Sequence, residues 1–483
     1  MDTAVVWFRR DLRVHDNEAL TAACDADAVV PVYCFDPRSY GTREFGGRHS
    51  FTYQKTGARR AAFYREAVAD LGERLRRLDL DLWIRHAPPA DALAEVVEAV
   101  DADSVHFQTL PLPEERAQAN RVTEAATSVG ATPERHWTHT LHHVDDLPRP
   151  VAEIDDTFTP FRKRVERASR VRDPLPEPDP PGTPADSPRR GEVPSMTALG
   201  FEGIPTYDER GVLAFAGGET VGKERVAEYV WEADRLREYK RTRNGLLGEG
   251  YSSKFSPWLN AGCLSPRYVQ SEVDRYEDER VSNQSTYWLT FELRWRDFFQ
   301  FQFAKHGGDF FTPGGIRNRQ IDWRDDPAQF HRWCEGRTGI PFVDANVREL
   351  NETGYMSNRG RQNVASFLAN NLRIDWRKGA AYFETRLVDY DPASNYGNWA
   401  YNSQVGNDSR DSYFDVVGQA KRYDENAEYV KTWCPELSDL PADYAHEPWT
   451  MNDGLQEAYG VVLGDDYPEP MIGLEASYEK LRS

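Results

Sequence analysis

The sequence has few cysteines, few lysines and no long apolar run. Its five cysteines are scattered over 483 residues without a CxxC pair, which predicts neither a disulfide framework nor a zinc site, and we assign no metal ligands. No stretch approaches the roughly 18 apolar residues of a membrane-spanning helix, and the first apolar run, VVWF, is followed at once by RRDLR instead of a signal-peptide core. We therefore expect a cytoplasmic protein of two or three domains that does not enter a membrane.

The charge is strongly one-sided. Acidic residues number 79 against 59 basic ones, of which only 10 are lysine, and the net charge is −20. An acidic surface that is poor in lysine suits a very salty cytoplasm, so a halophilic source is our hypothesis. Because such a chain repels the phosphate backbone of DNA, any nucleic-acid contact must come from a local cluster of arginines.

The first 140 residues alternate strand-like and helix-like segments. Buried strands are predicted at 4–8, 28–35, 81–86 and 104–109, and amphipathic helices at 17–26, 57–78, 89–101 and 113–129. This alternation predicts an α/β domain over residues 1–140 with a parallel sheet of Rossmann-like or flavodoxin-like type. No GxGxxG motif or P-loop follows the first strand, which argues against an ordinary dinucleotide or ATP phosphate site there.

After residue 140 the alternation of strands and helices ends. Residues 141–205 are rich in proline and charge and predict an exposed linker. Residues 206–483 predict a larger all-helical domain that ends in a short acidic tail. Its helical spacing is found at 219–240, 265–280, 283–306, 326–336, 343–352, 360–372 and 377–388.

Three tryptophans, Trp323, Trp376 and Trp399, lie in or beside polar, acidic sequence. Asp389, Asp391 and Asn395 come just before the last of them. Indole is easily oxidised by one electron, so a series of tryptophans beside carboxylates and an amide suggests a buried redox cofactor with an electron path to the surface. The alternative is that each tryptophan simply fills the core.

Three further segments carry polar groups near predicted helices. Ser252, Ser253 and Ser256 surround Lys254 and suit a pyrophosphate, although serines also act as simple helix caps. Glu292, Trp295 and Arg296 share adjoining helix faces, which fits either a ligand-facing helix or an aromatic core with one ion pair. Asn358, Arg359, Arg361 and Gln362 form a cationic helix entry that could meet an anion or could simply be solvated.

Several motifs together resemble the photolyase/cryptochrome family, and most closely its DASH cryptochrome branch. They are VVWFRRDLRVHDNEAL (5–20), QKTGARR (54–60), YKRTRNGLLGEGYSSKFSPW (239–258), STYWLTFELRWRDFF (285–299), NRGRQNVASF (358–367) and DYDPASNYGNWAYNSQVGND (389–408). The matches run from residue 4 to about residue 437 with consistent spacing.

The resemblance implies that the helical domain binds FAD in a bent conformation. It assigns Tyr239 and the loop Ser252, Ser253, Lys254, Phe255 and Ser256 to the phosphate side, Arg361 to the flavin edge, Asp389 and Asp391 to the flavin ring and the ribityl–adenine part, Asn358 to both cofactor and substrate, and Asn395 to flavin N5. An amide beside N5 tunes the electronics of the cofactor. Trp399, Trp376 and Trp323 match the proximal, middle and surface members of a photoreduction relay.

The resemblance also implies a substrate, a cyclobutane pyrimidine dimer flipped out of DNA. Glu292 and Asn358 would form hydrogen bonds with the dimer, and Trp295 would stack on it. Arg296 and Arg359 would contact the DNA. Two residues depart from ordinary dimer photolyases, namely Tyr401 in place of a second tryptophan and Gln362 in place of methionine. The DASH branch shares both, and its preference is for dimers in single-stranded DNA. A third departure is Asn371, where relatives have an aspartate paired with the arginine at the flavin edge, and the loss of that charge would leave Arg361 freer to stabilise a flavin anion.

The resemblance leaves the antenna chromophore open between methenyltetrahydrofolate, a deazaflavin and none, with Glu114 or Glu115 as candidate contacts. We predict a light-driven enzyme that repairs dimers, preferably in single-stranded DNA, with no obligate protein partner. The alternatives are a blue-light photoreceptor, and a purely nucleic-acid-binding module that would leave the flavin motifs unexplained.

Overall fold

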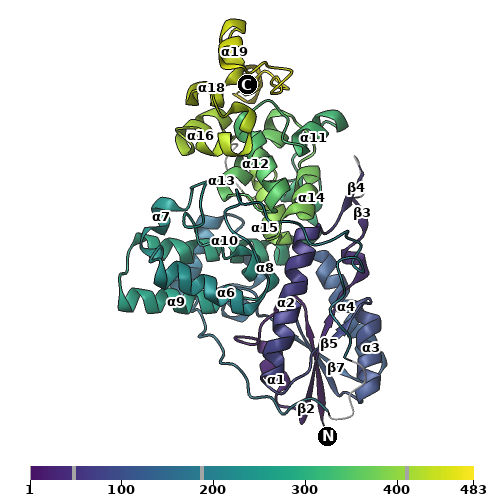
Figure 1. The fold of residues 1–483 in the computed structure, drawn as a ribbon. Helices are drawn as coiled ribbons and strands as arrows, with labels where there is room; N and C mark the ends of the chain where they lie inside the picture. Colours follow the sequence, from purple (N-terminus) through teal and green to yellow (C-terminus); the bar gives the residue numbers. More distant parts are fainter. Residues whose placement is uncertain (1, 46–49, 185–189, 408–412, 483) are drawn as a thin grey trace.

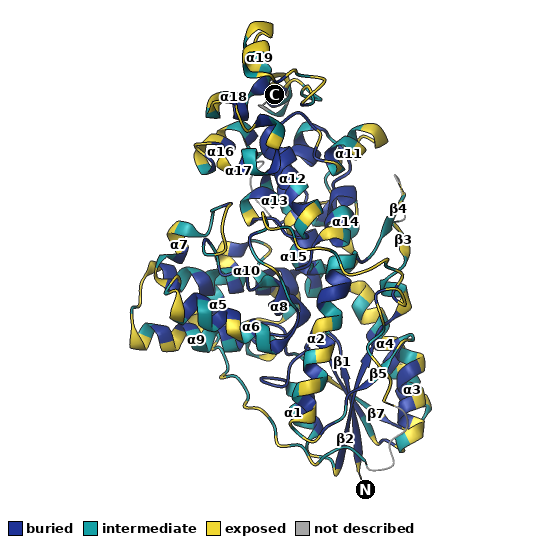
Figure 2. Cartoon of the chain, viewed as in Figure 1, coloured by how far each residue is buried: buried dark blue, intermediate teal, exposed yellow. Residues whose placement is uncertain are grey.

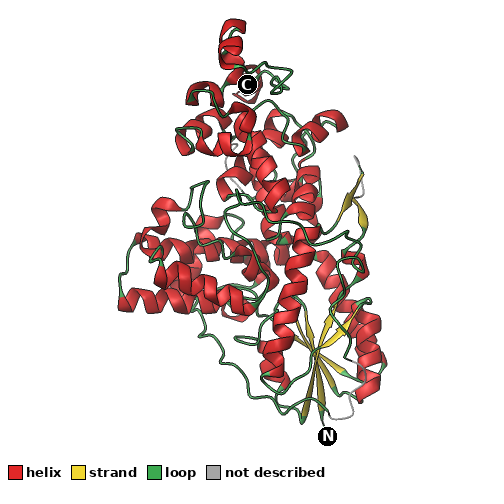
Figure 3. Cartoon of the chain, viewed as in Figure 1, coloured by secondary structure: helices red, strands yellow, loops and turns green. Residues whose placement is uncertain are grey.

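The computed structural model describes residues 2–45, 50–184, 190–407 and 413–482. Its N-terminal part is built on a parallel sheet with strand order β5-β2-β1-β6-β7 (Figure 3). The strands are β1 (Thr3–Phe8), β2 (Ala28–Cys34), β5 (Trp83–Arg85), β6 (Ser104–Gln108) and β7 (Thr132–His136). This is the Rossmann-type order, in which the first strand is central, and not the flavodoxin-type order. The predicted parallel α/β domain is confirmed.

The side chains of β1 alternate between two hydrophobic cores. Ala4, Val6 and Phe8 pack in the core that holds α1 (Glu18–Ala23) and α2 (Ala58–Arg76). Val5 and Trp7 pack in the core that holds α3 (Pro89–Val100) and α4 (Pro113–Ser128). The sheet is therefore covered on both faces, as Figure 1 shows.

The structure adds strands that the periodicity did not predict. The edge strand β7 has the polar sequence TPERH and exposes most of its residues, so it carries no buried-strand pattern. A separate antiparallel hairpin is formed by β3 (Thr42–Phe45) and β4 (Phe51–Gln54), which are half-buried at most. Burial pattern alone does not predict such exposed strands.

The remainder of the described chain is largely helical, as predicted, and its helices surround a buried core (dark blue in Figure 2). This core is rich in aromatic residues. The helices are α5 (Phe158–Ala168), α6 (Glu219–Val226), α7 (Tyr239–Thr242), α8 (Ser256–Ala261), α9 (Pro266–Glu279), α10 (Gln284–His306), α11 (Pro327–Cys334), α12 (Pro341–Thr353), α13 (Asn358–Ser366), α14 (Trp376–Arg386), α15 (Pro392–Asn402), α16 (Val416–Tyr423), α17 (Glu428–Trp433), α18 (Ala442–His446), α19 (Asp453–Tyr459) and α20 (Leu474–Arg482). The predicted helix at 219–240 ends earlier, because a π-helical segment, Ala227–Glu232, follows α6.

The segment predicted as a linker, 141–205, contains α5, whose Phe158 and Phe161 are buried in the helical core. Beyond α5 the described residues 169–184 and 190–218 contain no α-helix and run along the α/β part (Figure 1). There it is hydrogen-bonded to the sheet, since the Val29 N–H donates to the Gly182 carbonyl oxygen at 3.0 Å. The domain bounds 1–140, 141–205 and 206–483 stay a prediction.

Buried polar contacts join the two parts. Asp16 accepts from Arg267 at 2.6 Å in an ion pair, and the His15 ring is hydrogen-bonded to Glu219 at 2.7 Å. A polar interface of this kind fixes the orientation of the α/β part relative to the helices. None of the helices in the described residues has the length and apolar composition needed to span a lipid bilayer.

Candidate functional site

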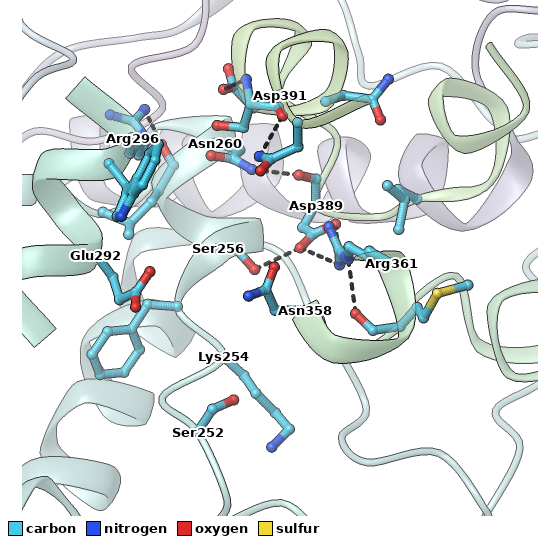
Figure 4. Close-up of a pocket in the computed structure, with 18 of the residues that line it drawn as sticks. Ser252, Lys254, Ser256, Asn260, Glu292, Arg296, Asn358, Arg361, Asp389 and Asp391 are labelled. Atoms are coloured by element: carbon cyan, nitrogen blue, oxygen red, sulfur yellow. Dashed lines mark hydrogen bonds and ion pairs between the residues drawn. The ribbon is translucent and has the colours of Figure 1, made fainter. Parts of the chain in front are cut away.

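A cavity of about 440 Å³ opens in the helical part, and segments far apart in the sequence meet around it. It is lined by most of the predicted site residues, namely Tyr239, Ser252, Ser253, Lys254, Phe255, Ser256, Glu292, Trp295, Arg296, Asn358, Arg361, Gln362, Asp389, Asp391, Asn395, Trp399 and Tyr401 (Figure 4). Trp323, Trp376 and Arg359 lie outside its wall. We call this space the first cavity.

Asp391 caps the start of α15 and ties the cavity to the α/β part. Its carboxylate accepts from the Ser394 N–H at 2.8 Å, from Arg10 at 2.8 Å and from Gln300 at 3.1 Å. Burial raises the pKa of this carboxyl, but Arg10 and Arg296 outweigh burial and bring the pKa to about 2. Asp391 is therefore a fixed anion on the cavity wall.

Asp389 is the second buried carboxylate. It accepts from Arg361 at 2.8 and 3.0 Å and from the Ser256 hydroxyl at 2.7 Å (Figure 4). The premise of the Asn371 hypothesis, that Arg361 is left without a balancing carboxylate, is wrong. Asn371 donates instead to the Ser477 hydroxyl in α20, and Asp389 supplies the charge that balances Arg361.

Asn395 and Trp399 lie one helical turn apart on α15 and face the first cavity. The Asn395 amide donates to the Ala380 carbonyl oxygen of α14 at 2.9 Å, which fixes its orientation. Trp399 packs edge-on against Phe383, with 5.1 Å between ring centroids, and its indole N–H is buried without a hydrogen-bond partner. A buried donor of this kind on a cavity wall fits a ligand that supplies an acceptor.

The serine-rich loop between α7 and α8 forms another part of the wall. Lys254 has a left-handed backbone conformation (φ 55°) and donates to the Glu249 carbonyl oxygen at 2.8 Å. Its ammonium lies over the Tyr251 ring at 3.4 Å. Burial lowers its pKa to about 6, so a bound anion is what this site needs to keep the lysine charged.

A less buried rim surrounds the cavity. It carries Glu292 on α10, Asn358 and Gln362 on α13, and the ring of Trp295. Glu292 forms an ion pair with Arg243 at 2.7 Å. Burial raises the pKa of Glu292, and Arg243 opposes that effect.

One face of Trp295 is already covered. Phe158 of α5 stacks on it with 3.7 Å between ring centroids, and Tyr401 contacts it edge-on at 6.1 Å. A stacking partner of Trp295 must therefore use its other face.

The two remaining predicted arginines are directed elsewhere. Arg296 lines the cavity, but its guanidinium donates to the main-chain carbonyl oxygens of His139 and Leu259. Arg359 lies outside the cavity wall and donates to the side chains of Asn244 and Gln362, at 3.1 and 3.0 Å.

Of the other two tryptophans, Trp323 lies deeper than predicted. The indole N–H groups of Trp323 and Trp376 donate to the same carbonyl oxygen, that of Pro313, at 3.0 and 3.2 Å. The two rings are therefore neighbours. The prediction that Trp323 is a surface residue is wrong, because only 4% of it is exposed and it is packed in the helical core.

A second cavity, of about 770 Å³, lies between the sheet and the helices. Both candidate antenna contacts, Glu114 and Glu115, line it, and so do Lys55, Tyr390 and Tyr396. Arg10 borders it as well and pairs with Glu115 at 3.1 Å, opposite its contact with Asp391. A thin wall thus separates the two cavities.

Arg10 and Arg243 were not predicted as site residues. Arg10 lies two residues after β1, and the carboxyl end of a parallel strand is where α/β folds place binding groups, so the position of Arg10 was a usable signal. The sequence carries no such signal for Arg243, because its partner Glu292 lies 49 positions away.

Comparison with known proteins agrees with this architecture. Residues 4–181 match the family model described as DNA photolyase, and residues 288–483 match the FAD binding domain of DNA photolyase. A curated protein from Natronomonas pharaonis named cryptochrome DASH is 59% identical over 482 residues and covers all of both chains.

Solved structures are similar along the whole chain. A cryptochrome from Synechocystis is 42% identical with a TM-score of 0.95, covering 100% of this chain and 99% of that one. A bacterial class III photolyase from Agrobacterium tumefaciens is 26% identical with a TM-score of 0.85, covering 100% and 96%.

The first cavity fits the group that this family binds. Its hydroxyls and the buried Lys254, which an anion would keep charged, suit a diphosphate. Its fixed carboxylates and the indole N–H of Trp399, which has no partner, suit a polar ring system. By its sequence matches and its fold, the chain belongs to the photolyase/cryptochrome family, in the DASH cryptochrome branch, and it carries the FAD-binding domain of that family.

Proposed function

We propose that this protein opens cyclobutane pyrimidine dimers with light and FAD, preferentially in single-stranded DNA. One observation carries the proposal. The first cavity has a partly exposed rim with Glu292, Asn358 and Trp295, and its wall also carries buried groups that suit a flavin, Asp389 and Asn395. A base that enters from solvent would therefore meet the cofactor inside one cavity.

The buried groups would hold FAD. Arg361, held by Asp389, would lie at the flavin edge, and the amide of Asn395 would face flavin N5. Ser252, Ser256 and Lys254 would face the diphosphate. Bound and reduced FAD supplies the electron that splits the dimer under light and takes it back afterwards.

The rim would select the substrate. Glu292, whose pKa is raised by burial, holds a proton more readily than an ordinary glutamate and can donate it in a hydrogen bond to a pyrimidine carbonyl oxygen. The amide of Asn358 adds a second polar contact, and the open face of Trp295 can stack on a base. These groups bind and orient the dimer, and the local cations Arg243 and Arg359 would offset the repulsion between DNA and an acidic protein.

The preference for single strands rests on the polar rim. Tyr401 and Gln362 offer less apolar stacking area than tryptophan and methionine, so less binding energy is left to unstack a base from a duplex. Unstacking costs a few kcal/mol, and a single strand largely avoids this cost.

The second cavity is our proposed site for an antenna chromophore, a folate or a deazaflavin. Its aromatic and acidic lining, with Tyr390, Glu114 and Glu115, supports this placement. We place the protein in the cytoplasm, where its five free cysteines would stay reduced.

A photoreceptor is the second candidate. It is favoured by the Arg243–Glu292 ion pair, since that pair must loosen before Glu292 can bind a base. In that case light would change the redox state of the cofactor without chemistry on DNA.

One experiment separates these functions. The reduced holoprotein is illuminated with a dimer-containing oligonucleotide, single-stranded or duplex, and the recovery of pyrimidine absorbance is followed. We expect recovery that is faster on the single strand. No recovery on either DNA would reject the enzyme, and equal rates would reject the strand preference. Glu292→Gln should weaken repair, and Glu279→Gln on α9, whose side chain is 59% exposed, is its surface control.

A further inference from the structure

The tryptophan path ends in a place where positive charge is poorly stabilised. Trp376 is completely buried and 4% of Trp323 is exposed. Both indole N–H groups donate to the peptide carbonyl oxygen of Pro313, which is not a proton acceptor near neutral pH. An oxidised indole there keeps its charge in the core, where an isolated ion is costly.

A tyrosine beside this path does have a base. The ring of Tyr396 lies 6.3 Å from that of Trp376, in an edge-on arrangement at 72°. Its hydroxyl donates to the Glu384 carboxylate at 3.0 Å. Both residues are buried, with 2% of Tyr396 and 1% of Glu384 exposed.

Two ion pairs link the Glu384 carboxylate to the protein surface. The Lys55 ammonium lies 3.2 Å from Glu384, and it also pairs with Glu114, whose side chain is 63% exposed. These residues line the second cavity, as does Tyr396. If Glu384 gained a proton, Lys55 would still be paired with Glu114, so the three groups together would become neutral.

Electron and proton must leave this tyrosine together. Burial and the neighbouring Glu384 raise the pKa of Tyr396 well above the ordinary value, so the phenol stays protonated at rest. Loss of the electron alone would leave a buried cation, whereas simultaneous transfer of the proton over one existing hydrogen bond leaves a neutral side chain.

We propose that Tyr396 is a second end of the electron path, a proton-coupled donor that uses Glu384 as its proton acceptor. This proposal rests on the proposed function and on the photoreduction relay that the family resemblance assigns to Trp399, Trp376 and Trp323. In the step, Tyr396 gives one electron to oxidised Trp376, which returns to its resting state. The Tyr396 O–H bond breaks, and its proton joins the carboxylate of Glu384. The oxidant that starts the path is light-excited, oxidised FAD, which gains the electron.

Neighbouring tyrosines lack this combination. Tyr382 donates to the Cys334 carbonyl oxygen and to the Asn351 side chain, which are not bases. Tyr53 reaches Glu384 at a longer distance, 3.5 Å. Tyr396 alone among these three combines a ring contact with a relay tryptophan and a carboxylate at 3.0 Å.

The test uses FAD-loaded protein that is illuminated and then frozen, with the electron paramagnetic resonance spectrum as the readout. We expect a tyrosyl signal in the wild type. It should be lost in Tyr396→Phe and in Glu384→Gln, which keeps the shape of the acceptor but removes the base. Its formation should slow in D₂O. Tyr467→Phe is the matched control, because Tyr467 is also buried and donates to a carboxylate, that of Asp344 at 2.6 Å, and it should keep the signal.

Two results would overturn the proposal, namely a tyrosyl signal that survives in Tyr396→Phe, or a wild type that shows only tryptophan radicals. The variant Trp399→Phe tests the relay separately from the role of Tyr396. If that variant reduces FAD under light as fast as the wild type does, the relay is wrong. If it does not, and Tyr396→Phe behaves like the wild type, only the role of Tyr396 is wrong.

Discussion

The ammonium of Lys254 is buried beside carbonyl oxygens and an aromatic ring, and its pKa is lowered to about 6. Near neutral pH the empty cavity therefore favours the uncharged amine. A diphosphate would favour the ammonium, so ligand binding and protonation are coupled at this residue.

This coupling predicts the pH dependence of FAD affinity. Above about pH 6 the free protein must take up a proton when it binds FAD, so affinity should rise as pH falls towards 6 and then level off. Lys254→Met should flatten this profile and weaken binding about tenfold near neutral pH, as loss of a charge-assisted contact worth about 1.5–3 kcal/mol implies. Titration of apoprotein with FAD measures both effects. Lys240→Met, which removes an exposed lysine, should bind as the wild type does, and a sloping profile in Lys254→Met would contradict the assignment.

Tyr401 leads to a prediction about substrate choice. Its ring meets Trp295 edge-on, so Tyr401→Trp combined with Gln362→Met should enlarge the stacking surface of the rim. Since stacking contributes about 1–3 kcal/mol per base, repair of duplex DNA should rise roughly tenfold relative to single-stranded DNA. The ratio of kcat/KM for the two DNAs measures this change. Tyr444→Trp, in α18 and away from the cavity, should leave the ratio unchanged, and an unchanged ratio in the double variant would reject our explanation.

Helices α14 and α15 approach closely because α14 has no side chain at one point of contact. A Cβ atom on Gly379 would lie 2.2 Å from the Trp399 ring and 2.6 Å from Leu368. The glycine therefore determines where the proximal tryptophan of the proposed relay can lie.

Gly379→Ala should lower the free energy of unfolding by about 1–3 kcal/mol through overpacking, which outweighs the gain of about 1 kcal/mol that alanine normally brings to a helix. It should also slow photoreduction, because the Trp399 ring must move. Chemical denaturation and transient absorption measure the two effects. Gly454→Ala on α19, where a Cβ has ordinary contacts, should be neutral or stabilising. Equal behaviour of the two variants would show that the close approach has no role.

The elements differ in how well the sequence predicts them. Strands such as β1 and helices such as α2 have strong periodicity, and their bounds differ from the predicted ones by one or two residues. Helix α15 was read only as a motif, although Asp391 and Pro392 are an ordinary N-cap and first residue that predict a helix start. The convergence of site residues on one cavity was predictable through the family motifs. The pairings of Arg361 with Asp389 and of Glu292 with Arg243 were not, since they depend on tertiary packing.

The whole molecule carries a net charge of −20, and its exposed ion pairs only partly offset the repulsion. Salt shortens the Debye length from about 10 Å at 0.1 M to about 3 Å at 1 M, which weakens both the repulsion and the surface pairs. Because exposed pairs contribute little individually, relief of the repulsion should dominate.

We therefore expect the unfolding temperature to rise as KCl is increased from about 0.1 M towards 1 M and above. Thermal unfolding followed by circular dichroism at constant pH tests this expectation. A parallel series in sucrose separates screening from general exclusion effects. An unfolding temperature that is constant or falls with salt would contradict the halophilic hypothesis.

Residues 389–396 form part of the wall between the two cavities, beside Arg10. Asp389, Asp391 and Asn395 border the first cavity, while Tyr390 and Tyr396 border the second. If each cavity holds a chromophore, the two pigments are tuned by alternate residues of one short segment. A substitution in this segment that shifts the absorption of one chromophore will therefore also alter the surroundings of the other.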